Sequence, residues 1–269
     1  KQPTLLPFAE QQQQALKDVF ITDKNLAQLA DGLGTTLGAA YLARAHYVDR
    51  DHFTSVSPAV AGVIAYAIAA ARANSNAGKY FFANLTTDGK APVSPDAKAI
   101  LDTTGGSPDM FGHAYGFPAG STGAGAFGNA RPFQTEPTFV RIVGRDYFGT
   151  PADNTVYNRG PMMNLINSPS FPSGHTTYGY MGSLLLALVV PERYQEMIAR
   201  GAEYGNDRIV VGAHYAMDVL GGRTLALYAM AHLLANDPSY LAQTYRGAPS
   251  MKDFRSAVIT ARADVRKVL

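Results

Sequence analysis

Apolar residues recur at helical spacing along most of the chain, and this pattern predicts a protein built from helices. The spacing is clear in residues 11–46, in the Ala-rich run after Pro58, and in Val219–Leu234 and Met251–Leu269. Ser57 followed by Pro58 is typical of a helix start, with an N-cap residue and a proline in the first turn. Few segments alternate apolar and polar residues as strands do, and no repeat of fixed period is present. We therefore expect an all-α fold.

The middle of the chain breaks this pattern. Residues 105–128 contain eight glycines in 24 positions, interleaved with His113 and aromatic side chains. Each glycine inside a helix costs about 1 kcal/mol relative to alanine, so we expect a loop here. A long loop in a compact domain is either a plain surface connection or part of a binding site, and the sequence leaves both interpretations open.

Length and composition narrow the class of protein. The chain has 269 residues, of which 46% are hydrophobic, and we expect one domain with a sizeable core over residues 1–269. The chain has no cysteine, which excludes a disulfide scaffold, a thiolate zinc site and a cysteine nucleophile. The formal net charge of +2 gives no electrostatic reason to expect a nucleic-acid partner. The uncharged apolar stretch Ala59–Ala71 is shorter than the roughly 20 residues that span a membrane, so we expect no membrane span.

The location of the protein is a weaker inference from the sequence. The first residue is Lys1 rather than Met, which fits a chain whose secretory signal has been removed, although a trimmed sequence would look the same. The absence of cysteine is compatible with an oxidising compartment. We expect a periplasmic or secreted protein, and the sequence leaves self-association into a homo-oligomer open.

Three short clusters carry the candidate chemistry. In chain order they are Arg131-Pro132; Pro172-Ser173-Gly174-His175; and Arg208, with His214 six positions later and Asp218 four positions after that.

The second cluster has the parts of an anion-binding site. Ser173 can cap a helix whose first turn holds Gly174 and His175. The unpaired N–H groups of that turn and the helix dipole attract an anion, and glycine lets an oxyanion approach the backbone closely. His175 would lie beside the bound anion, where an imidazole could donate a proton to a leaving oxygen.

The third cluster supplies complementary parts. If residues 214–220 begin a helix, His214 and Asp218 share one face of it. Asp218 could then accept the Nδ1 proton of His214 and leave Nε2 free as a nucleophile. Arg208 and Arg131 would provide planar, permanently charged donors for phosphate oxygens. The clusters together hold the parts of a phosphoryl-transfer site that uses no metal.

In this order and at these separations, the three clusters resemble the signature of the type 2 phosphatidic acid phosphatase superfamily. That superfamily includes bacterial class A non-specific acid phosphatases, membrane lipid phosphatases and vanadium haloperoxidases. The resemblance covers Arg131 to Asp218, about a third of the chain. It implies a helical bundle of the acid phosphatase and vanadium haloperoxidase type.

The resemblance also implies a role for each matched residue. His214 is the expected nucleophile, forming a phosphohistidine intermediate, and Asp218 is the carboxylate that orients it. His175 is the expected general acid, which protonates the leaving alkoxide and later activates water. The expected phosphate-binding groups are Arg131, Arg208, Ser173 and the amide of Gly174.

The chain departs from the family pattern at two positions. A lysine is expected seven residues before Arg131, and this chain has Ala124 there. One cation is therefore missing or comes from elsewhere, with Lys90 and Lys98 as candidates. The residue before Arg208 is usually serine, and here it is Asp207, which need not face the phosphate because adjacent side chains on a helix diverge by about 100°.

The remaining histidines and other reaction types fit less well. His46, His52 and His232 are expected to be structural. His113 is a somewhat better candidate for a functional residue, because it lies in the glycine-rich loop. Ser173 lacks the Gly-x-Ser-x-Gly turn of a serine hydrolase. His175 and His214 have no close third ligand for zinc, and no P-loop is present.

These observations favour a metal-independent, acid phosphatase-like hydrolase of phosphomonoesters that needs no cofactor. Two alternatives stay open. One is a vanadium-dependent haloperoxidase, because vanadate resembles the phosphoryl transition state and would use the same groups. The other is a phosphate-binding module whose turnover was lost with the lysine at position 124. The expected partner in each case is a small phosphoester or oxyanion.

Overall fold

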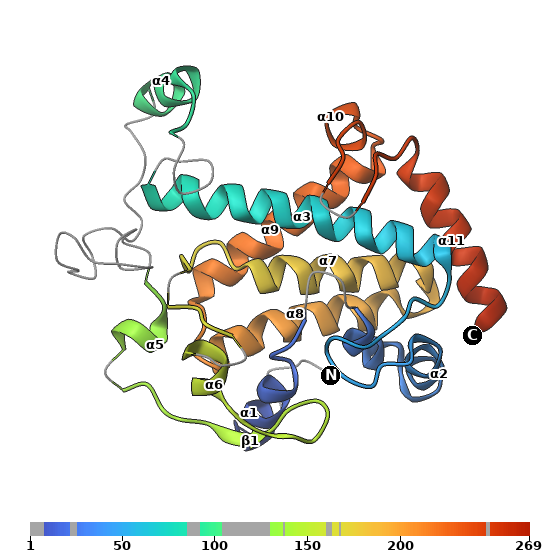
Figure 1. The fold of residues 1–269 in the computed structure, drawn as a ribbon, viewed down its shortest axis with the longest axis horizontal. Coiled ribbons are helices and arrows are strands. Elements are labelled where there is room, and N and C mark those ends of the chain that lie inside the picture. The colour runs from blue at the N-terminus through green and yellow to red at the C-terminus, as the bar shows by residue number, and fades with distance from the viewer. Residues whose placement is uncertain are drawn as a thin grey trace.

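The fold is a helical bundle, as Figure 1 shows for the computed structural model. The structure describes residues 8–21, 26–84, 92–103, 130–136, 138–159, 163–166, 168–245 and 248–269. The α-helices are α1 (Phe8–Lys17), α2 (Thr35–Ala45), α3 (Pro58–Asn84), α4 (Pro95–Thr103), α5 (Pro132–Thr135), α6 (Asn154–Arg159), α7 (Gly174–Val189), α8 (Tyr194–Val210), α9 (Ala216–Leu234), α10 (Pro238–Leu241) and α11 (Phe254–Val268). The described residues also form two 3₁₀ helices, η2 (Ala27–Leu33) and η5 (Pro191–Arg193). The all-α prediction is confirmed.

The two described strands form a small antiparallel ribbon outside the bundle. β1 (Val143–Arg145) pairs with β2 (Pro151–Asp153), with Gly144 opposite Ala152. The sequence analysis did not predict this ribbon, because strands of three residues are too short to show an alternating pattern.

Helix α7 is the centre of the bundle. Most of its side chains are buried, and it packs against α8, α9, α3 and α11. α8 approaches closely because Gly179 on α7 leaves room for the ring of Tyr204, whose Cδ1 would lie 2.2 Å from a Cβ at position 179. In Figure 1, α3 crosses this group of helices on one side and α11 lies at its end. Both α7 and α9 pack against α3 and α8.

The predicted helix starts and ends are largely confirmed. α3 begins at Pro58, and the amide of Val60 donates to the hydroxyl of Ser57. α9 and α11 cover the two C-terminal segments that were expected to be helical. A second, smaller core lies away from α7, where Leu16, Phe20 and Tyr157 pack together. In the described part of the chain, no helix combines the length and apolar character needed to cross a membrane.

Candidate phosphoryl-transfer site

The structure brings the three sequence clusters together where four helices begin or end. Arg131 directly precedes α5, and Arg208 lies near the end of α8. His175 is in the first turn of α7, and Asp218 is in the first turn of α9. His214 lies two residues before α9, in the turn that follows α8. These five residues are called the site below.

The turn between α8 and α9 explains the spacing of the third cluster. Gly212 has φ +73°, a left-handed conformation that favours glycine, and it reverses the chain after α8. The amides of Ala213 and His214 both donate to the carbonyl of Arg208, at 3.0 and 3.2 Å. The six-residue separation therefore ties His214 directly to the end of the helix that carries Arg208.

The first turn of α7 begins with the cap that the sequence predicted. Ser173 is the N-cap, and its Oγ accepts a hydrogen bond from the amide of Thr176 at 3.2 Å. The amide of Ser173 donates to the carbonyl of Asp218 at 3.0 Å, which joins the starts of α7 and α9. Gly222 permits this close approach, because a Cβ at that position would lie 2.6 Å from the carbonyl oxygen of Ser173.

His214 and Asp218 interact, but not as two residues on one helical face. Nδ1 of His214 lies 3.3 Å from Oδ2 of Asp218, and both side chains are fully buried. The same Oδ2 accepts hydrogen bonds from the hydroxyl of Ser170 and, at 2.8 Å, from the amide of Tyr215. The condition that residues 214–220 begin a helix is not met at His214, because α9 begins at Ala216. The pairing arises because Tyr215 caps α9 and Asp218 folds back over the turn.

Arg131 is held in a network of oxygen acceptors and also contacts His214. Its Nε and Nη2 donate to the carbonyl and hydroxyl of Ser168 at 2.9 and 3.1 Å. Nη2 also donates to the carbonyl of Pro169, and Nη1 donates to that of Ala213. Nη1 lies 3.0 Å from Nε2 of His214. In contrast to the sequence expectation, Nε2 is therefore not free in this structure.

Arg208 is anchored on one side only. Its Nη2 donates to the carbonyl of Asp18 at 2.6 Å, and its Nη1 donates to that of Val19 at 3.3 Å. The guanidinium lies 4.6 Å from the ring centroid of Tyr204, a cation–π distance. Its buried Nε has no hydrogen-bond partner within the described ranges, so one donor of this cation remains available.

Both site histidines are held neutral in this structure. Burial lowers the pKa of His175 well below its usual value, and so do the charges of Arg208, His214, Lys79 and Arg131. Burial, followed by the charges of Arg131 and Lys79, lowers the pKa of His214 in the same way. Because these groups act on each other's pKa, they occupy one electrostatic environment. No hydrogen bond joins His175 to a described residue, and its side chain is only partly buried.

Asp207 faces away from this site, as expected. Burial, together with the charge of Asp18, raises the pKa of Asp207 to about 10, so its carboxyl group is protonated near neutral pH. Burial opposes ionisation of Asp18 as well, but Arg200 holds the pKa of Asp18 at about 2. Arg200 donates to both carboxylate oxygens of Asp18. Asp207 thus belongs to the network that supports the anchor of Arg208.

Of the two lysines proposed as replacements for the missing cation, Lys98 does not lie in this site. Lys98 is on α4, where its 59% exposed side chain pairs with Asp102 at 2.8 Å. That suggestion was wrong, because α4 directs this lysine to the surface. Lys90, Ala124, His113 and the glycine-rich segment 105–128 lie outside the described residues.

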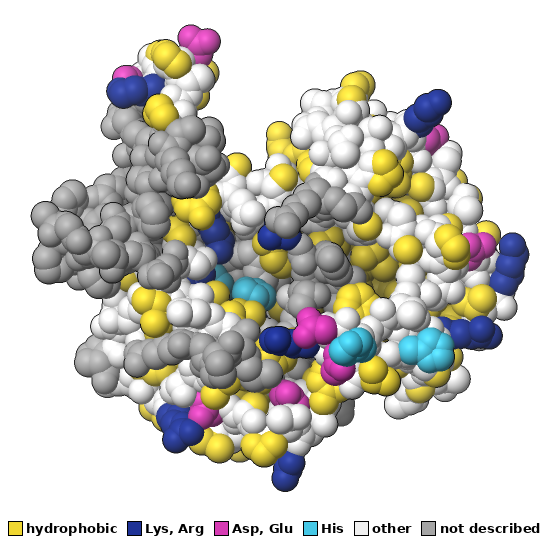
Figure 2. Space-filling model, in the orientation of Figure 1, with side chains coloured by type: hydrophobic (Ala, Val, Ile, Leu, Met, Phe, Trp, Pro, Cys, Tyr) yellow, Lys and Arg dark blue, Asp and Glu magenta, His cyan; other side chains and the backbone are white. Residues whose placement is uncertain are grey.

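Two residues of α3 that the sequence analysis missed lie beside the site. Lys79 donates to Oγ of Ser168 at 3.1 Å, the same oxygen that accepts from Arg131. Ser75 is fully buried one turn earlier. The sequence offered only a weak indication of this role, because Lys79 is a single lysine in a helix rich in alanine. Figure 2 shows histidine and Lys or Arg surfaces close together in a hollow on this face of the molecule.

The other histidines have ordinary structural settings. His46 ends α2 in a left-handed conformation, and exposed His52 pairs with Asp49. His232 stacks on Tyr240 with 4.7 Å between the ring centroids. Within the described ranges, no group of three or more His, Cys, Asp or Glu side chains is arranged to hold a metal ion.

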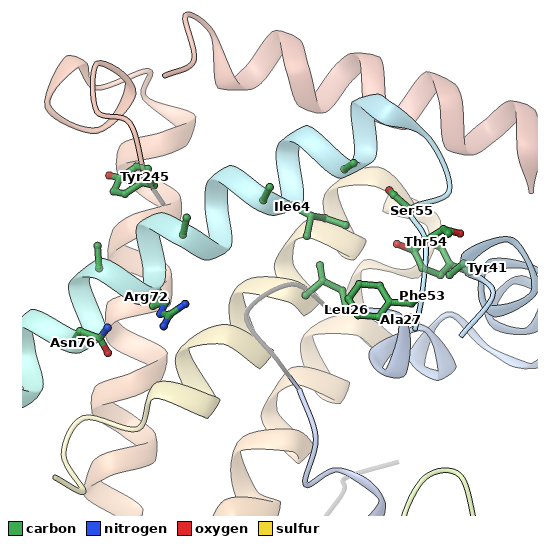
Figure 3. A pocket seen from close by; sticks show the side chains of 15 residues that line it. Leu26, Ala27, Tyr41, Phe53, Thr54, Ser55, Ile64, Arg72, Asn76 and Tyr245 are labelled. Atoms are coloured by element: carbon green, nitrogen blue, oxygen red, sulfur yellow. The ribbon is translucent and has the colours of Figure 1, made fainter. Parts of the chain in front are cut away.

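A separate cavity of about 520 Å³ lies along α3. It is mainly apolar, and Figure 3 shows Leu26, Ile64 and Phe53 at one part of it and Arg72 and Asn76 at another. None of the site residues lines this cavity.

The residues of this site lie in a segment that is similar to a known family. Residues 110–239 match the PAP2 superfamily. The match includes all three clusters and confirms the resemblance derived from them.

Several curated proteins are similar to parts of the chain. The chain is 45% identical to the non-specific acid phosphatase of Salmonella typhimurium over 69 residues, which cover 26% of this chain and 28% of that protein. It is 28% identical to the non-specific acid phosphatase of Providencia stuartii over 143 residues, 49% of this chain and 56% of that protein. The acid phosphatase of Zymomonas mobilis is 42% identical over 64 residues, 24% of each chain. The matched segments thus span between about a quarter and just over half of these relatives.

Proposed function

We propose that this protein hydrolyses phosphomonoesters through a covalent intermediate on His214. The observation that carries the proposal is the convergence of His214, His175, Arg131 and Arg208 at the first turn of α7, where Ser173 caps the helix. The similar proteins described above are a non-specific acid phosphatase in two cases and an acid phosphatase in the third, which supports the same reaction class.

The first step transfers the phosphoryl group to the protein. Nε2 of His214 attacks phosphorus, and the bond between phosphorus and the ester oxygen breaks. Asp218 stabilises the imidazole by accepting from Nδ1, 3.3 Å away. His175 gives its proton to the leaving oxygen, so the alcohol departs neutral.

The second step returns the free protein. A water molecule attacks phosphorus and gives one proton to His175, while the phosphorus–nitrogen bond breaks and its electron pair returns to Nε2. Orthophosphate leaves, and His175 is again protonated. In both steps the two arginines and the amides at the start of α7 stabilise the charge on the equatorial oxygens.

This mechanism requires His175 to be protonated although its pKa is lowered in the ligand-free protein. The lowering comes from burial and from repulsion by neighbouring cations. A bound phosphate dianion would cancel that repulsion and favour the charged imidazole. Substrate binding would thereby load the general acid with its proton.

The test is hydrolysis of an aryl phosphate by the wild type and by His214→Ala. We expect the substitution to abolish turnover, while the exposed control His52→Ala keeps it. A rapidly quenched reaction with labelled substrate should leave an acid-labile label on the wild type and none on His214→Ala. Unchanged turnover in His214→Ala would reject the assignment.

Two additions to the same assay test the finer parts of the proposal. Activity that survives treatment with a chelator would support metal independence, whereas its loss would contradict it. Vanadate should inhibit hydrolysis by occupying the site as a transition-state mimic. A vanadate-loaded protein that oxidises halide with peroxide would instead favour the haloperoxidase alternative.

A further inference from the structure

The side chains around the site carry more positive than negative charge. Lys79, Arg131 and Arg208 are close enough to lower the pKa of both site histidines. Asp218 is the described carboxylate that acts on Lys79 and Arg131. Asp18 also acts on Arg208, but it is already paired with Arg200, so these cations leave an excess of positive charge that a phosphate monoester dianion would balance. Burying such a surplus is costly without a bound anion.

Lys79 is linked to the phosphate-binding arginine through a single oxygen. Its Nζ and Nη2 of Arg131 each lie 3.1 Å from Oγ of Ser168. No other hydrogen bond joins Lys79 to the described part of the chain, so its remaining N–H groups are available. An ammonium group paired only with a hydroxyl, beside a guanidinium, is typical of an anion site rather than of a structural ion pair.

The pKa of Lys79 agrees with this interpretation. Burial and the charge of Arg131 lower it to about 7, while Asp218 opposes that shift. A bound dianion would oppose it further and keep the ammonium group charged.

Ser75 places a second polar group from α3 at the start of α7. It lies four residues before Lys79, on the same face of the helix. Its buried Oγ has no hydrogen-bond partner in the described structure. That oxygen would lie 3.3 Å from a Cβ at Gly174, and Cγ of Pro172 would lie 3.3 Å from one at Gly78. This part of α3 therefore runs directly along the Pro172–Gly174 turn.

We infer that α3 completes the phosphate-binding site, with Lys79 supplying the cation that Ala124 lacks and Ser75 donating a hydroxyl hydrogen bond. A phosphoryl group has three equatorial oxygens, and this arrangement surrounds them with Arg131, Arg208 and Lys79. The inference rests on the proposed function, because it assigns a phosphoester to the site.

The test compares Lys79→Met, Lys79→Arg and Lys98→Met. We expect Lys79→Met to weaken orthophosphate binding in calorimetry, and to lower kcat/KM for an aryl phosphate, by about tenfold or more. Lys79→Arg should retain much of the orthophosphate affinity and of kcat/KM, because arginine keeps the positive charge. Lys98→Met removes an exposed lysine of α4 and should change neither value.

Ser75→Ala provides a second, independent variant. Removing an unpaired buried hydroxyl should leave the melting temperature unchanged or raise it. The orthophosphate dissociation constant should nevertheless rise about fivefold, the effect of one neutral hydrogen bond.

The outcomes separate this inference from the proposed function. If the wild type hydrolyses the ester and Lys79→Met binds orthophosphate as tightly as the wild type does, the inference is overturned and the phosphatase assignment stands. A purely structural lysine would give that result with a lower melting temperature. If the wild type hydrolyses nothing but Lys79→Met loses orthophosphate affinity, the phosphatase assignment fails and the role of Lys79 stands.

Discussion

Nη1 of Arg131 lies 3.0 Å from Nε2 of His214. Arginine can only donate hydrogen bonds, so Nε2 is the acceptor and the proton of the neutral imidazole lies on Nδ1, toward Asp218. The contact therefore holds His214 in the tautomer that nucleophilic attack requires. It also covers the attacking lone pair. A bound phosphoryl group must take this N–H from His214 before Nε2 can reach phosphorus.

Arg131→Lys should impair the reaction although it preserves the charge. Lysine cannot reproduce the planar set of N–H groups that contact Ser168, Pro169, Ala213 and His214. We expect kcat for an aryl phosphate to fall by about 100-fold or more, as for loss of a transition-state donor. Steady-state kinetics with the exposed control Arg141→Lys checks this. A change in KM alone would contradict it.

The buried, neutral His214 should make stability depend on pH. Its pKa is lowered in the folded protein, so below about pH 6.5 the unfolded chain binds a proton that the folded chain does not. The free energy of unfolding should therefore fall on acidification, with this group contributing up to about 1.4 kcal/mol per pH unit.

Urea unfolding at pH 7 and pH 5 measures this effect. His214→Gln removes the titrating group and should reduce the difference between the two pH values. The exposed His52→Gln should leave the difference as it is in the wild type. An equally steep pH dependence in His214→Gln would show that other groups cause it.

Asp207→Asn should stabilise the protein near neutral pH. The pKa of Asp207 is raised to about 10, so above about pH 4 the unfolded chain releases a proton that the folded chain retains. This lowers the free energy of unfolding as pH rises, and asparagine avoids that loss while still donating a hydrogen bond to Asp18. The advantage of Asp207→Asn should grow from pH 5 to pH 8 in urea unfolding.

Asp18→Asn, in the same network, should have the opposite effect on stability from Asp207→Asn. It leaves Arg200 buried without its main carboxylate partner, which should cost about 3–5 kcal/mol. If Asp207→Asn were destabilising to a similar extent, Asp207 would be ionised in the folded protein and the proposed protonation state would be wrong.

The sequence predicted the parts of this molecule that depend on local rules. The start of α3 at Pro58 and the cap at Ser173 follow from neighbouring residues alone. The three clusters could be combined into one predicted site because their residue types, in that order, fit a single phosphoryl-transfer reaction. The match of residues 110–239 confirms the family resemblance, whereas the catalytic roles and the export of the protein stay predictions.

The missed features depend on contacts between distant segments. Lys79 reaches Ser168 across 89 positions, and nothing in the surrounding residues of α3 indicates that contact. The Arg131–His214 bond joins residues 83 positions apart and depends on a guanidinium orientation set by backbone carbonyls. A four-residue spacing would put His214 and Asp218 on one helical face only if the helix included His214, but α9 begins at Ala216, with Tyr215 as its N-cap.

The contact between α7 and α9 leads to the last prediction, which concerns Gly222→Ala. A Cβ at position 222 would lie 2.6 Å from the carbonyl oxygen of Ser173 and 3.0 Å from Cβ of Thr176. Both neighbours are fixed by the first turn of α7, so the helices must move apart. That shift would strain the bond from the amide of Ser173 to the carbonyl of Asp218 and displace the first turns of α7 and α9, which carry His175 and Asp218.

We therefore expect Gly222→Ala to lose about 1–3 kcal/mol of stability, as for overpacked cores, together with most of its kcat. Gly62→Ala, at an exposed position of α3, is the control, because no atom lies within 4 Å of its added Cβ. Alanine there should stabilise the helix by about 0.5–1 kcal/mol without changing kcat. Thermal unfolding and aryl phosphate kinetics on both variants test the contrast. Full activity in Gly222→Ala would mean that the close approach of Ser173 to α9 does not position the site.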